Sequence, residues 1–145
     1  MVTSRDDILS LFDFAHDRLQ QRLAGVTAEE LAWQPTDDDD LTLRWRLQHL
    51  AETLGADRNP AWLGADVSAW EGSPEATPES VGSAYEHLRA TLATVSEEVL
   101  AQPIGTVGGP FGQDTRRAFA LHVVDELVHH GAEAALLRDL YERRS

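Results

Sequence analysis

The sequence contains no cysteine among its 145 residues, and all twelve of its basic residues are arginine. The absence of cysteine excludes disulfides, thiolate metal ligands and a cysteine nucleophile, so sulfur chemistry would need a thiol supplied by a small molecule. Positive charge is also scarce, because 25 acidic residues give a net charge of -13. Nucleic acid and anionic membrane surfaces are therefore disfavoured as partners.

A secretory leader is absent from the opening residues MVTSRDDILS, which have neither a basic start nor an apolar stretch. We therefore expect a cytoplasmic protein. Hydrophobic residues make up 42% of the chain and charged residues 26%, a balance typical of a folded soluble protein rather than a disordered or membrane one. The length fits one domain, residues 1–145, with a substantial hydrophobic core.

Four segments carry apolar residues at helical spacing, and no segment alternates for long enough to form a sheet. The predicted long helices cover Ser4 to Gly25, Thr42 to Arg58, Pro78 to Leu100, and a last segment that is capped by Asp114 or Thr115 and ends near Arg143. A further short helix is expected from Thr27 to Trp33, since Thr27 can cap it and Pro35 must end it.

Two longer connections separate these segments. Residues 64–78 are rich in glycine, proline and serine, and a second connection contains GTVGGPFG. The glycine segment lacks the lysine and the spacing of a phosphate-binding loop, so it is predicted to be a flexible connection or lid. Four long helices with two such connections predict an all-α fold, a four-helix bundle.

The last predicted helix carries ionisable side chains on its apolar face. Glu126 and His130 lie in the middle of a face whose apolar members are Phe119, Val123, Leu137 and Tyr141. A carboxylate that faces a core is costly unless it is paired, protonated or bound to a metal. Side chains four residues apart on a helix lie about 5–6 Å apart at Cβ, so one cation could bind both. A buried ion pair between Glu126 and His130 satisfies the same spacing without a metal, and the pattern alone does not decide between the two.

The other histidines give weaker signals. His122 lies one turn before Glu126, where it could support a ligand by a hydrogen bond. His16 and His87 lie off the apolar stripes of their helices and are expected to be exposed. His129 lies well to the side of Glu126 and His130, and none of these three histidines is assigned a role. His49 stands about 120° from the leucine stripe of its helix, so periodicity alone does not direct it toward the last helix.

Two segments resemble the DinB/YfiT-like superfamily of metalloenzymes, which includes mycothiol-dependent maleylpyruvate isomerase and bacillithiol transferase-like proteins. LTLRWRLQHLAETL resembles the family's helix with the first metal histidine, and LHVVDELVHHGAEAALLRDL resembles the helix with the other two ligands. The opening DDILSLFDFAHDRLQQRLAGVTAEELAWQP is similar too. Matched residue by residue, the resemblance implies a four-helix bundle of the DinB type with His49, Glu126 and His130 as metal ligands.

The chain departs from the family at two points. Most members carry histidine where this chain has Glu126, although the mycothiol-dependent isomerase resembles this chain in having glutamate. The isomerase also has a further C-terminal domain, for which we expect no room after Ser145. These departures weaken the case for the isomerase reaction but not for the site.

Two imidazoles and a carboxylate leave positions open on a metal, as in catalytic sites. Such ligands suit zinc or nickel, and also manganese or ferrous iron. The resemblance implies an enzyme that transfers or uses a low-molecular-weight thiol such as mycothiol on a small-molecule substrate. A metal-hydroxide hydrolase or an iron oxygenase fits the same ligands, and a non-enzymatic, stress-related metal-binding or interaction bundle is the alternative from another class. Glu52 and Asp125 are possible general bases, but the simpler interpretation of each is a solvated surface carboxylate.

A subunit contact is also predicted. Leu121, Val124 and Val128 make the last helix apolar on the side away from Glu126 as well. That stretch should be either deeply buried or part of an interface, and we expect a homodimer.

Overall fold

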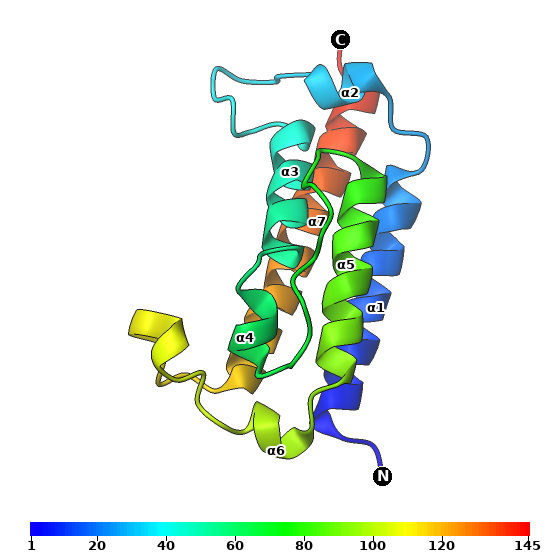
Figure 1. Ribbon diagram of the computed structural model, residues 1–145. Helices are drawn as coiled ribbons and strands as arrows, with labels where there is room; N and C mark the ends of the chain where they lie inside the picture. Colours follow the sequence, from blue (N-terminus) through cyan, green and yellow to red (C-terminus); the bar gives the residue numbers. More distant parts are fainter.

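The computed structural model describes residues 1–145 and contains four long helices. These are α1 (Ser4–Leu23), α3 (Leu43–Leu54), α5 (Pro78–Ala93) and α7 (Arg116–Glu142) (Figure 1). Short helical pieces lie between them: α2 (Ala28–Ala32), α4 (Asn59–Leu63), α6 (Glu97–Leu100) and the 3-10 helix η1 (Thr106–Phe111). There is no β-strand, only an isolated bridge between Pro103 and Thr115. The predicted all-α bundle is confirmed.

The long helices form a closed ring in which α1 and α3 each pack against both α5 and α7. In Figure 1, α1 and α7 run in one direction, and α3 and α5 run in the other. Residues 64–77 therefore travel back along the bundle from the end of α4 to the start of α5, as the first predicted connection requires. The arrangement makes α3 and α7 antiparallel neighbours.

Threonine caps begin most of the helices. Thr27, Thr77 and Thr115 accept hydrogen bonds from backbone N–H groups three residues on. Thr27 is the cap that the sequence predicted, and Thr115 is the cap of the last helix from the two candidates, Asp114 and Thr115. α1 begins at Ser4 as predicted. The spacing of Ser4 and Asp7 favours a capping box, but the box lies one residue earlier, with Thr3 as the cap and Asp6 as its partner. Each cap satisfies an otherwise unpaired amide and so fixes where its helix starts.

Two helices are shorter than predicted. α3 ends at Leu54 with Gly55 as its C-cap, and Asn59-Pro60 opens α4 instead of closing the preceding helix. Proline is tolerated in a first helical turn because the N–H it lacks would be unpaired there. Similarly, α5 ends at Ala93 and Ser96 caps the separate α6. The apolar spacing continues across the second break, from Leu92 to Val95 and Val99, which is why periodicity missed it. After Leu54 the next stripe positions are the charged Asp57 and Arg58, so the predicted helix was too long there by the residues up to the Asn59-Pro60 pair.

One hydrophobic core of 26 buried residues fills the ring. Phe119 and Val123 of α7 are buried in it, and Leu137 packs against it from the side. On the opposite side of α7, Val124 is also buried, whereas Leu121 is 47% exposed. Core burial therefore explains only part of that apolar side, and the homodimer stays a prediction. None of the helices is both long enough and apolar enough to span a lipid bilayer.

His16 is buried, so the prediction that it is exposed is wrong. Its ring stacks on Tyr85 of α5, with centroids 3.7 Å apart and planes at 11°. Because α1 packs against two neighbours, its buried surface is wider than a single stripe. Burial lowers the pKa of His16.

The segment GTVGGPFG forms η1, which the sequence did not predict. Its path depends on Gly105 and Gly109, whose φ angles of +91° and +55° favour glycine. η1 packs against α4 beside the start of α7.

Candidate metal centre

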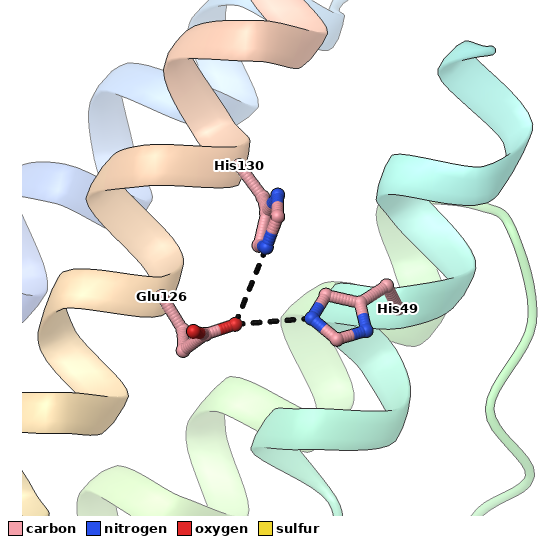
Figure 2. Close-up of side chains that lie close together, drawn as sticks. All are labelled: His49, Glu126 and His130. Atoms are coloured by element: carbon pink, nitrogen blue, oxygen red, sulfur yellow. Dashed lines mark hydrogen bonds and ion pairs between the residues drawn. The ribbon is translucent and has the colours of Figure 1, made fainter. Parts of the chain in front are cut away.

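His49, Glu126 and His130 come together where α3 lies against α7. Figure 2 shows the imidazole of His49 pointing from α3 toward the two side chains of α7. Glu126 Oε2 lies 3.0 Å from His49 Nε2 and 3.3 Å from His130 Nε2. Three donor atoms of this cluster lie within 4.8 Å of one another. The structure thus brings together the three side chains that the resemblance implied.

The chemistry of these donors fits a divalent cation. Tetrahedral ligands that bind zinc at about 2.0–2.2 Å lie about 3.3–3.6 Å from one another. The separation of 3.3 Å between Glu126 Oε2 and His130 Nε2 matches this range, and the 3.0 Å to His49 Nε2 is slightly shorter. Two ring nitrogens and a carboxylate oxygen are also a common catalytic ligand set. The contacts equally satisfy the ion pair that the sequence left open, with protons on the imidazoles instead of a metal.

The orientation of His130 is fixed from its other ring nitrogen. His130 Nδ1 lies 2.5 Å from Glu133 Oε1, and the second oxygen of Glu133 lies 3.1 Å from Arg46 Nη2. A carboxylate at Nδ1 holds a proton there, which leaves the lone pair of Nε2 facing Glu126. This tautomer is the one that a metal at Nε2 requires.

Arg46 anchors this chain of contacts. Its side chain is buried, donates to the carbonyl oxygen of Asp40 and pairs with Glu133. Burial raises the pKa of Glu133, but its hydrogen bonds to Arg46 and His130 outweigh burial and hold the pKa below its usual range. Glu133 is therefore ionised at neutral pH.

Trp45 forms one wall of the centre. Its ring stacks on His49 with centroids 4.7 Å apart and meets His130 edge-on at 5.7 Å. An indole in these positions restricts the rotation of both imidazoles and excludes water from one side.

Burial raises the pKa of Glu126. The hydrogen bond with His49 and the electrostatic effect of the three nearby imidazoles lower this pKa by more than burial raises it. The net pKa lies below the ordinary value, so Glu126 is a carboxylate at neutral pH. The third imidazole is His122, whose Nε2 lies 3.9 Å from Glu126 Oε1. His122 therefore stands at the edge of the centre, at a distance too long for the hydrogen bond that its position suggested.

Solvent reaches the cluster. The side chains of His49, Glu126 and His130 are 30%, 18% and 12% exposed. A cation held there would keep positions free for other ligands, as catalytic sites do and closed structural sites do not.

A second group of possible ligands shares one member with the first. His129, His130 and Glu133 also have donor atoms within 4.8 Å of one another. His129 is exposed, and Glu133 is already occupied by Arg46 and His130. The first group is therefore the better site.

The remaining candidates lie outside the centre. Glu52 is exposed and accepts a hydrogen bond from Gln48, and Asp125 is exposed. His87 is half-buried and lies 2.9 Å from the carbonyl oxygen of Ser68. Sequence reasoning missed Glu133 and Arg46. Glu133 could have been found because it follows His130 by three residues on the same helix, whereas nothing local links Arg46 to it.

Comparison with known proteins adds the family to this geometry. A family model described as the DinB superfamily matches residues 11–134. The chain is also similar in fold to the crystal structure of a conserved protein from Enterococcus faecalis. The TM-score is 0.64 and the sequence identity 20%, over 99% of this chain and 100% of the other. No curated protein sequence matches significantly.

Proposed function

The chain belongs to the DinB superfamily, and we propose that it is a metal-dependent enzyme that uses a low-molecular-weight thiol. His49, Glu126 and His130 would hold one divalent cation, with zinc or nickel favoured and iron or manganese also suited to the donors. When bound, such a cation favours the thiolate form of a nearby thiol and polarises a carbonyl group.

The observation that carries the proposal is the convergence of three donor side chains at a solvent-accessible point in a chain that has no thiol of its own. Glu133 and Arg46 hold His130 in the binding tautomer, and Trp45 limits the motion of His49 and His130. A thiol such as mycothiol would have to enter from solvent, because no cysteine can supply one. The exposure of the three donors leaves room for it.

Metal content tests the site first. We expect about one equivalent of metal per chain after purification without chelators or a nickel column, and its loss in His49→Gln and Glu126→Ala. His129→Gln is the matched control, because it removes an exposed histidine from the second group only. Retention of metal in His49→Gln and its loss in His129→Gln would move the site to the second group. A metal-free parent protein of unchanged stability would favour the non-enzymatic bundle.

Thiol use has its own test. The spectrum of the cobalt-substituted protein should change when the cognate thiol is added, with mycothiol, bacillithiol, coenzyme A and glutathione as the probes. The change should be absent in His49→Gln. A spectrum that no thiol alters would refute thiol use and leave a metal-hydroxide hydrolase as the function of the same centre.

A further inference from the structure

A pocket of about 260 Å³ lies where α4, η1 and the start of α7 meet. Its apolar lining includes three aromatic rings and an isoleucine: Trp62, Phe111, Phe119 and Ile104. Trp62 is central, with its ring centroid 5.1 Å from that of Phe119 and 6.2 Å from that of Phe111. Phe111 is 56% exposed, so its ring borders the open side of the pocket. These rings suit a flat apolar ligand.

Arg58 supplies a positive charge to the same pocket. Its guanidinium carbon lies 4.2 Å from the ring centre of Trp62 and 5.6 Å from that of Phe119. The side chain has no ion pair within 4.0 Å and no hydrogen bond to the protein, although the chain carries 25 acidic residues. Its N–H groups are therefore available to a ligand, and a guanidinium binds a carboxylate through two parallel hydrogen bonds.

The pocket adjoins the metal centre through His122. The imidazole of His122 lines the pocket and lies 3.9 Å from Glu126 Oε1. His122 precedes Glu126 by one helical turn, so a ligand in the pocket would lie one turn from the His/Glu/His cluster.

We propose that this pocket binds a small organic monocarboxylate with a flat apolar body, with its carboxylate at Arg58 and its body against Trp62 and Phe119. Asp114 lines the same pocket and disfavours a second negative charge there. The role of the bound molecule as the electrophile that meets the thiol rests on the proposed function. Binding itself does not require the metal.

Calorimetric titration of the metal-free protein tests the pocket, with 2-naphthoate as the probe and the neutral 2-naphthalenemethanol as its partner. We expect naphthoate to bind about tenfold more tightly than the alcohol. Arg58→Gln should weaken naphthoate binding by about tenfold and change alcohol binding by less than about twofold. Arg44→Gln is the matched control, since Arg44 is exposed in the first turn of α3, at the other end of the bundle, and its loss changes the net charge equally.

Asp114→Asn gives a second, independent readout. It should improve binding of naphthalene-2,6-dicarboxylate by several times more than binding of naphthoate, because it removes repulsion felt by the second carboxylate. Equal affinity for naphthoate and the alcohol, or equal losses in Arg58→Gln and Arg44→Gln, would overturn the inference.

Failure of the pocket is distinguishable from failure of the metal centre. If naphthoate does not bind while the parent protein holds metal and His49→Gln loses it, the pocket inference fails and the proposed function stands. If naphthoate binds the metal-free protein as expected and no metal is held, the pocket stands and the proposed function fails. With manganese in the centre, faster relaxation of the naphthoate protons should confirm that the two sites adjoin, and unchanged relaxation would refute their adjacency.

Discussion

Glu133 offers the sharpest test of how this protein prepares its metal centre. One oxygen of its carboxylate lies 2.5 Å from His130 Nδ1, and the other lies 3.1 Å from Arg46 Nη2. Replacing Glu133 by alanine frees the ring of His130 to rotate and to change tautomer. Replacing it by glutamine keeps an oxygen that can accept from Nδ1 but removes the charge.

The size of the effect follows from these contacts. Removing the carboxylate partner of a metal-binding imidazole weakens metal affinity by about 10- to 100-fold, or about 1.4–2.8 kcal/mol. We expect Glu133→Ala near the upper end and Glu133→Gln near the lower end. Glu133→Ala also leaves the buried Arg46 without its carboxylate, which should lower the free energy of unfolding by about 1–3 kcal/mol.

Zinc affinity should be measured by competition with a colorimetric chelator, and unfolding by urea denaturation of the metal-free proteins. His129→Gln is again the matched control, because His129 Nε2 lies 3.6 Å from Glu133 Oε1, but the side chain is exposed and is not one of the three donors of the centre. Its zinc affinity should stay within about twofold of the parent value. Equal zinc affinity in Glu133→Ala and the parent, with the fold retained, would refute the positioning role.

Other predictions concern the bundle itself. Burial lowers the pKa of His16, so the unfolded chain binds more protons than the folded one as pH falls below the ordinary value of 6.5. The contribution of His16 to the free energy of unfolding should therefore be complete above that pH and decline below it, by at most about 1.4 kcal/mol per pH unit. Urea denaturation at several pH values should show a smaller decline in His16→Gln. Leu50→Ala should cost about 2–5 kcal/mol, since the side chain is fully buried. Leu136→Ala, at a 58% exposed position, should stay within about 0.5 kcal/mol, and comparable losses in the two would contradict the placement of the core. Arg138→Met leaves the buried Glu30 without two hydrogen bonds of 2.7 and 3.0 Å, so thermal unfolding should show a loss of about 2–4 kcal/mol, and an unchanged midpoint would contradict that pairing.

Helix existence and most helix starts could be predicted from the sequence, because they depend on neighbours along the chain. Thr27, Thr77 and Thr115 each bind an amide three residues away, so a short stretch of sequence contains the whole interaction. The breaks after Leu54 and Ala93 could not be predicted in this way. After Ala93, Val95 and Val99 keep the helical spacing, so the pattern looks unbroken where the backbone turns. After Leu54 the apolar stripe stops at Asp57 and Arg58, but no apolar pattern marks Gly55 as the point where the helix ends.

The residues of the candidate centre also fall into two groups, those that one helix brings together and those that the packing of helices brings together. Glu126 and His130 were predicted as a pair since a single helix fixes their separation, whatever surrounds it. His49 was assigned by family resemblance, and the packing of α3 against α7 brings it to Glu126. The pairing of Arg46 with Glu133 and the pocket beside His122 join residues far apart in the chain. Contacts between helices depend on how whole faces pack, which no local spacing encodes, so only the tertiary structure decided them.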